Sequence, residues 1–389
     1  MAWDEGHTID SRWEHARKVA SGLHAHWTLG TSYSGFTNAL VRESPRVVTG
    51  LKRKLRQAML AMGRRHQTRC GWQAFAADGS RVEAPLTQAN EDELKCAGRK
   101  KTGPQVFVTT LWHMGLGLPW DFRVGPGTDS ERRHLEQMLD DLPQNSLVVA
   151  DAGFVGYELC QRVLKAGQSF LLRVGGNIRL LTDLGWEHEE RNGMVYLWPL
   201  KHRNSPPLVL RLIVLQHDNQ TVYLLTNVFD GKRLSNKEAG VLYEMRWGVE
   251  VFYRSYKQTL SRRRLLSRTP ATCLAECQWT MLGLWLLGLM TVERLIIKGV
   301  DPLCWSVAKA RNAVRCAMQV ACSRTRCGRL FDDLAKSTKD VYNRRGRKGA
   351  RNYPRKKREK PPGPPKLQSA SLQEIQRAKR LQAKNRLAA

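Results

Sequence analysis

The stretch Tyr243–Lys257, YEMRWGVEVFYRSYK, has the periodicity of an amphipathic helix. At about 100° per residue, a phenol, a carboxylate and three cations gather on one side: Tyr243, Glu250, Arg246, Arg254 and Lys257. Apolar residues take the opposite side: Leu242, Met245, Val249, Phe252 and Tyr256. Ser235 and Glu238 fit a capping box for the start of this helix. By itself the polar side also fits a solvated face with an i,i+4 ion pair between Arg246 and Glu250.

The charge of the chain indicates the class of partner. The 389 residues include 64 Lys and Arg against 35 Asp and Glu, a formal net charge of +29. Such a field favours polyanions, so DNA or RNA is the leading expected partner and an anionic membrane the second. The most apolar segment, 279–292, is shorter than the about 20 residues that span a bilayer, and we expect it to be a buried core helix. The nine cysteines are scattered without a CxxC pair, which favours free thiols in a reducing compartment over structural zinc.

Upstream of this helix, the expected order of elements is three strands, helix, strand, helix, strand. The first strand ends at the turn signal Asp78-Gly79-Ser80, and residues 84–103 are expected to form a loop. The next two strands form a hairpin. The remaining ranges are strands 105–112, 118–124, 146–150 and 169–174, and helices from Thr128 or Ser130 to Asp141 and over 156–166.

The expected parts of the chain differ in composition and in the pattern of their apolar residues. The segment 47–62 is a basic amphipathic helix that either packs on the core or holds DNA through Lys52, Arg53, Lys54 and Arg56. The segment from about Asn343 is cationic and bears Pro and Gly, which predicts disorder, and its last part, 371–389, fits a weak basic helix. We expect an N-terminal helical, DNA-binding region (1–66), a first core part (67–174), a β-rich insertion (175–228), a second core part (229–300), a helical region (301–342) and a basic, disordered tail (343–389).

Three carboxylates are notable by position: Asp78 at the end of a strand, Asp151 after the apolar strand 146–150, and Glu250 on the polar helical face. Carboxylates brought together repel each other, and Mg²⁺ or Mn²⁺ would remove that cost. Two such ions support in-line phosphoryl transfer, with the cations and the phenol of the helix holding phosphates. The alternatives are a turn residue for Asp78 and a strand-end cap for Asp151.

The spacing Y-x2-R-x3-E-x6-K, from Tyr243 to Lys257, resembles the Y-R-E-K signature of DDE transposases of the IS4 type. Asp78 in ADGS and Asp151 in VVADAGF match the first and second aspartates of that family. The resemblance covers roughly residues 72–270. It implies an α/β fold: an RNase H-like mixed-sheet catalytic core with a β-rich insertion, flanked by helical N- and C-terminal regions.

The resemblance also implies a function and its site. The chain would be the transposase of an insertion sequence, a prokaryotic, cytoplasmic and nucleoid-associated enzyme that cuts element ends and joins them to target DNA. Asp78, Asp151 and Glu250 would be catalytic and bind two Mg²⁺ ions, with Mn²⁺ as a substitute. Transposon-end DNA would be contacted by Tyr243, Arg246 and Lys257, with Arg254 on the same face. The partners would be double-stranded DNA and a second copy of the chain, with no membrane.

One feature departs from the family pattern. Relatives that form a hairpin intermediate stack a tryptophan of the strand before the Y-R-E-K helix on a flipped base, whereas the corresponding segment here is TVYLLT. Tyr223, Trp186 and Trp198 are the nearby aromatic residues, so a hairpin intermediate stays an open question. Two other functions stay open as well: a metal-dependent nuclease that does not join ends, and a non-catalytic DNA-binding derivative of a transposase.

Overall fold

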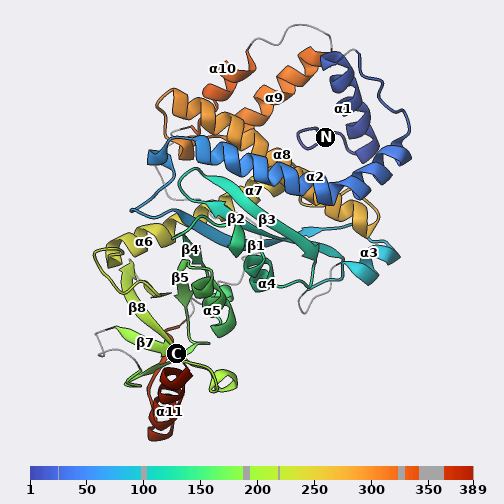
Figure 1. Cartoon of the computed structure of the whole chain (residues 1–389). Helices are drawn as coiled ribbons and strands as arrows, with labels where there is room; N and C mark the ends of the chain where they lie inside the picture. The colour runs from blue at the N-terminus through green and yellow to red at the C-terminus, as the bar shows by residue number, and fades with distance from the viewer. Residues whose placement is uncertain are drawn as a thin grey trace, which may run out of the picture. The chain divides into compact units, whose positions relative to one another are not determined.

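The computed structural model describes residues 1–24, 26–97, 103–186, 193–217, 220–322, 329–340 and 363–388. The chain divides into two compact units, each built from two segments (Figure 1). Unit 1 comprises Met1–Ser146 and Met245–Thr338, and unit 2 comprises Leu147–Glu244 and Lys339–Ala389. The α/β class and the chain order of three strands, helix, strand, helix and strand are as expected for the RNase H-like core.

Unit 1 contains an antiparallel sheet of β1 (Ala74–Glu83), β2 (Gln105–His113) and β3 (Leu118–Pro126). The predicted turn at Asp78-Gly79-Ser80 is wrong, because β1 continues through it and Asp78 lies opposite Thr110 of β2. Gly79 serves close packing here: a Cβ on it would come within 2.6 Å of the Phe107 ring. The predicted hairpin of the second and third strands is confirmed.

Helices cover the sheet of unit 1. The long helices α2 (Tyr33–Ala61) and α8 (Pro270–Ile297) pack against each other and against β3 (Figure 1). Among the residues that the structure describes, α8 alone is long and apolar enough to span a membrane, and 61% of its most apolar window is buried in the fold. This agrees with the core helix expected from the sequence. The other helices of unit 1 are α1 (Ile9–Leu23), α3 (Gln88–Glu93), α4 (Glu131–Glu136), α7 (Trp247–Arg254), α9 (Val307–Cys322) and α10 (Leu330–Ala335).

Two predictions for unit 1 need correction. The segment 84–103, predicted as a loop, contains α3, which begins where the Thr87 hydroxyl accepts the N–H of Asn90 at 3.3 Å. The helix expected to reach Asp141 ends at Glu136 and is followed by a 3-10 turn, Leu139–Asp141. Further short turns of this kind in unit 1 are Arg64–His66 and Pro302–Cys304.

The DNA-holding role considered for the basic helix is wrong for two of its four cations. Lys52 is 6% exposed, and its Nζ lies 2.8 Å from Oδ1 of the fully buried Asp121. Arg56 is 3.7 Å from the same carboxylate and donates to Asp141 Oδ1 at 3.1 Å. Because this face of α2 packs on β3, both cations pair with the buried Asp121, and Arg56 also pairs with the exposed Asp141. Arg53 and Lys54 are exposed.

Unit 2 is a mixed sheet with the strand order β10-β6-β7-β8-β9-β5-β4. The pairs β4–β5 and β10–β6 are parallel, and the other neighbours are antiparallel. The bounds are β4 (Leu147–Ala150), β5 (Ser169–Val174), β6 (Arg179–Thr182), β7 (Met194–Leu197), β8 (Leu208–His217), β9 (Gln220–Thr226) and β10 (Lys366–Ser369). Helices α5 (Tyr157–Lys165) and α6 (Asn236–Met245) and the 3-10 turns Ala152–Phe154 and Leu200–His202 complete this part of the unit. The β-rich character predicted for 175–228 is confirmed by the strands β6, β7, β8 and β9.

The C-terminal segment belongs to unit 2. The weak basic helix predicted for 371–389 is confirmed as α11 (Leu372–Ala388). The disorder predicted for the tail as a whole is wrong for β10 and α11, whereas residues 343–362 lie outside the described residues. Glu374 of α11 pairs with Arg203, whose side chain is 7% exposed, and lies 3.5 Å from Arg179. These ion pairs and the pairing with β6 bring order to a segment that lacks a core of its own.

Candidate active site

The helix predicted over Tyr243–Lys257 forms as successive segments. Glu238 Oε2 accepts the N–H of Ser235 at 2.9 Å, and the Ser235 hydroxyl accepts the N–H of Glu238 at 3.2 Å, so the predicted capping box is confirmed. The helix α6 ends at Met245, α7 begins at Trp247, and a π-helical turn spans Ser255–Thr259. The wider i→i+5 turn changes the angle at which Lys257 leaves the helix. The division between the units falls after Glu244, so Tyr243 belongs to unit 2 and the cations of the face to unit 1.

In unit 1, Asp78 lies in an unusual electrostatic environment. Burial raises the pKa of its carboxyl to about 6, and Glu250 and Glu131 act in the same direction. The Arg246 guanidinium and the N–H of Gly79 oppose this rise in pKa. The fold therefore places a half-buried acid within the electrostatic field of two other carboxylates and one cation.

The second acid of unit 1 is held by an ion pair. Arg246 Nη2 donates to Glu250 Oε1 at 3.0 Å, across one helical turn. The Arg246 side chain is 8% exposed and that of Glu250 is 32% exposed, so the carboxylate keeps access to solvent while the guanidinium is enclosed. The simple i,i+4 pair considered from the sequence is present, but it is partly buried and Arg246 also acts on Asp78.

The remaining cations of the helix differ from each other. Arg254 is exposed. Lys257 is half-buried in the π turn, where burial and Arg263 lower the pKa of its ammonium group, while Glu83 and Asp78 oppose this. Lys257 therefore lies within the field of Asp78, as expected from the sequence.

Tyr253 is a residue of this region that the sequence interpretation omitted. Its hydroxyl lies 3.0 Å from the carbonyl oxygens of Asp78 and Val108 and 2.8 Å from Thr110 Oγ1. Its position three residues after Glu250 was a usable signal, because i,i+3 residues are neighbours on a helix. Glu131, the first residue of α4, was also missed, since nothing in its local sequence separates it from an ordinary first-turn acid.

In unit 2, Asp151 follows β4 directly and caps the 3-10 turn Ala152–Phe154. Its Oδ1 accepts the N–H of Ala152 at 2.8 Å and the hydroxyl of Tyr243 at 3.3 Å. The strand-end cap considered as the alternative role of Asp151 is therefore present. The structure also brings Asp151 together with the tyrosine of the Y-R-E-K signature.

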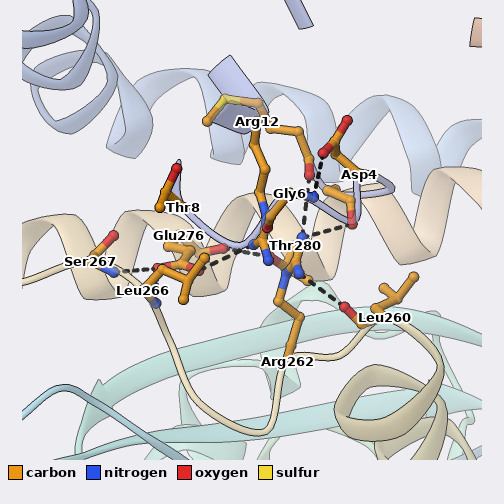
Figure 2. Close-up of polar contacts among 12 residues, drawn as sticks. Asp4, Gly6, Thr8, Arg12, Leu260, Arg262, Leu266, Ser267, Glu276 and Thr280 are labelled. Atoms are coloured by element: carbon orange, nitrogen blue, oxygen red, sulfur yellow. Dashed lines mark hydrogen bonds and ion pairs between the residues drawn. The ribbon is translucent and has the colours of Figure 1, made fainter. Parts of the chain in front are cut away.

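A buried polar network holds the segment that follows the helix (Figure 2). Arg262 is 2% exposed and donates to the carbonyl oxygens of Leu260, Met1 and Ala2 at 3.0–3.3 Å. Burial lowers the pKa of its guanidinium to about 10. Glu276 of α8 accepts the N–H groups of residues 266 and 267 at 3.0 and 2.9 Å. The network thereby fixes the chain just beyond Lys257.

A family model described as "Transposase DDE domain" matches residues 71–286, more than half of the chain. This chain belongs to the DDE transposase family. The match extends beyond both aspartates and the whole Y-R-E-K segment. The IS4-type resemblance stated from the motif is confirmed by the relatives described next.

Two curated transposases are similar to this chain. The chain is 28% identical over 224 residues to "Transposase InsG for insertion sequence element IS4" of Escherichia coli. The aligned region covers 54% of this chain and 50% of that protein. It is 20% identical over 195 residues to a protein described as a transposase for insertion sequence element IS4SA of Synechocystis sp. The aligned region covers 49% of this chain and 54% of that relative. The chain thus spans about half the length of these relatives. Among solved structures, a piggyBac transposase synaptic complex with hairpin DNA is similar with a TM-score of 0.43 and 12% identity, over 69% of this chain and 58% of that one.

Membership in this family implies a dependence on divalent metal ions, and the acidic side chains of this chain fit such ions. Carboxylate oxygens are the hard ligands that Mg²⁺ and Mn²⁺ prefer. Desolvation is the main cause of the raised pKa of Asp78, with a smaller contribution from Glu250, and a bound cation would favour the charged form of both carboxylates. Within the described part of the chain, no three His, Cys, Asp or Glu side chains form a ready-made metal cluster. The metal ligands therefore stay a prediction.

Proposed function

We propose that this transposase cuts the ends of an insertion element and joins them to target DNA by metal-assisted phosphoryl transfer. The observation that carries the proposal is the half-buried Asp78 in unit 1, whose carboxyl lies in the electrostatic field of Glu250 and Arg246, two residues that pair with each other at 3.0 Å. Acids whose pKa is raised by desolvation and by specific charged neighbours gather at functional sites. Family membership supports the same reaction class.

In this proposal Asp78, Asp151 and Glu250 hold two Mg²⁺ ions, for which Mn²⁺ can substitute. Bound there, the ions would supply Lewis-acid stabilisation of the charge that develops on the scissile phosphate. The geometry of unit 1 supports the assignment of Asp78 and Glu250. For Asp151 the support comes from its place directly after β4 and from the motif.

The protein groups have separate proposed roles. Arg246 orients the Glu250 carboxylate through the 3.0 Å contact and adds positive charge for the DNA phosphates. The exposed Arg254 and the half-buried Lys257 contact the backbone of the transposon end. Tyr243 orients Asp151 through its hydroxyl and contacts the same DNA. Because two element ends have to be held together during joining, we propose that the chain acts as a homodimer on double-stranded DNA.

The test is a cleavage and strand-transfer assay with labelled inverted-repeat ends, a target plasmid and Mg²⁺. The wild-type chain is expected to nick the ends and join them. Glu250→Gln is expected to lose cleavage by more than about 100-fold while its affinity for the ends stays within about two-fold, since Arg254 and Lys257 are retained.

A matched control is Glu244→Gln, which changes the same residue type at an exposed position of the preceding helix and is expected to leave cleavage unchanged. Cleavage without joining by the wild-type chain would identify a nuclease. DNA binding with no cleavage of any end would identify the non-catalytic derivative and refute the proposed function.

A further inference from the structure

The hydroxyl of Tyr253 joins two layers of unit 1. Tyr253 lies on α7 and is 6% exposed. Its oxygen lies within 3.0 Å of three oxygens that belong to the sheet: the carbonyls of Asp78 and Val108 and the hydroxyl of Thr110. Burial raises the pKa of this phenol well above its ordinary value, so the group stays protonated and able to donate.

The Tyr253 hydroxyl is the donor in all three contacts. Its single proton is therefore shared among the carbonyl oxygens of Asp78 and Val108 and the hydroxyl oxygen of Thr110. Thr110 is the cross-strand partner of Asp78 in the register of β1 and β2. Tyr253 therefore contacts both members of the cross-strand pair of Asp78 and Thr110.

This contact has a specific relation to Glu250. Tyr253 follows Glu250 by three residues, less than one helical turn, so any shift of α7 that moves one moves the other. A second anchor lies two residues before Glu250: a Cβ on Gly248 would come within 2.2 Å of the Trp112 ring on β2. Glu250 therefore lies between two contacts of α7 with the sheet: the packing of Gly248 on Trp112 and the hydrogen bonds of Tyr253.

We propose that Tyr253 is a positioning residue for the transposase reaction, which holds the Glu250 helix in register with the strand that carries Asp78. The inference rests on the proposed function, in which Asp78 and Glu250 act in the same reaction. The Tyr253 hydroxyl would keep these two carboxylates at the correct distance from each other. A metal site needs its ligands held within a fraction of an ångström, and a misplacement of about 1 Å costs on the order of 100-fold in rate.

The test compares two buried tyrosines of the same helical stretch in the full chain. Tyr253→Phe removes the hydroxyl at the sheet. The control Tyr256→Phe removes the hydroxyl of a residue that is also buried but contacts Cys277 Sγ at 3.3 Å. Single-turnover cleavage at saturating DNA, the Mn²⁺ concentration that gives half-maximal cleavage, and Mn²⁺ affinity by electron paramagnetic resonance without DNA are measured for both variants.

We expect Tyr253→Phe to cleave 10- to 100-fold more slowly, to require more Mn²⁺ and to bind Mn²⁺ more weakly, with its DNA affinity unchanged. High Mn²⁺ should restore part of the rate. Tyr256→Phe should keep wild-type Mn²⁺ dependence even where its melting temperature falls. Equal Mn²⁺ affinity and equal rates in the two variants would overturn the role of Tyr253. A wild-type chain that neither cleaves DNA nor binds Mn²⁺ would instead refute the proposed function, and the positioning role with it.

Discussion

The buried pair of Lys52 and Asp121 gives a prediction whose size follows from the structure. Lys52 Nζ lies 2.8 Å from Asp121 Oδ1 and also donates to the carbonyl of Phe122. Lys52→Met keeps the length of the side chain and leaves the buried carboxylate without its nearest cation. Breaking such a pair from one side costs about 3–5 kcal/mol. We expect the lower end, because Arg56 and Arg123 stay 3.7 Å from the carboxylate.

A loss of about 3 kcal/mol corresponds to a melting temperature lower by roughly 6–12 °C for a domain of 150–250 residues. Differential scanning calorimetry of the transition of unit 1 measures this shift. Arg53→Met is the matched control, since Arg53 is the exposed neighbour, and it should melt like the wild type. Adding Asp121→Asn to Lys52→Met should recover part of the loss because no unpaired charge is then buried. Equal melting of the Lys52 and Arg53 variants, with weaker DNA binding by Lys52→Met, would refute this reasoning and restore the DNA-holding role.

Two further predictions concern the same fold. Burial lowers the pKa of His113 to about 4, below the value near 6.5 of the unfolded chain. Between pH 6.5 and 4, His113 therefore binds a proton in the unfolded chain but not in the folded one. The free energy of unfolding should fall as pH is lowered through this range, by about 2 kcal/mol at pH 5. Urea unfolding of His113→Asn should show a smaller loss, and an equal one would contradict the assignment. Glu374→Ala removes the partner of Arg203 and should expose α11 to limited proteolysis at residues 366–388, whereas a wild-type digestion pattern would show that β10 alone holds the segment.

Much of the fold follows from local periodicity. The hairpin of β2 and β3, the short apolar strand β4 and the helix α5 were predictable because each has a length and pattern that a single element satisfies. The start of α6 was predictable from Ser235 and Glu238, whose capping contacts depend only on neighbours in the chain.

The features that failed depend on distant partners. Asp78-Gly79-Ser80 has the composition of a turn, but the Phe107 ring fills the space beside Gly79 and the strand continues. Lys52 has the local sequence of an exposed cation, and only the folded structure brings Asp121 to within 2.8 Å of its Nζ. β10 pairs with β6 across about half of the length of the chain, and no local pattern reveals such a pairing.

The candidate site shows the same division. The motif predicts which acids and cations belong to the helix, and the contact of Arg246 with Glu250 follows from their spacing. The raised pKa of Asp78 and the hydroxyl contacts of Tyr253 arise from the packing of α7 on the sheet, which the helical periodicity alone does not determine. The π turn at Ser255–Thr259 also changes the angular position of Lys257 relative to the simple helical projection.

The parallel pairing of β10 with β6 has a consequence for synthesis of the chain. The strands β6 to β9 leave the ribosome well before residues 366–369, which close the free edge of β6. Through the whole synthesis of α7, α8 and α9, unit 2 therefore exposes an open sheet edge, and open edges recruit strands from other chains. Once the C-terminal segment is made, the short strand β10 takes over as the edge strand beside β6.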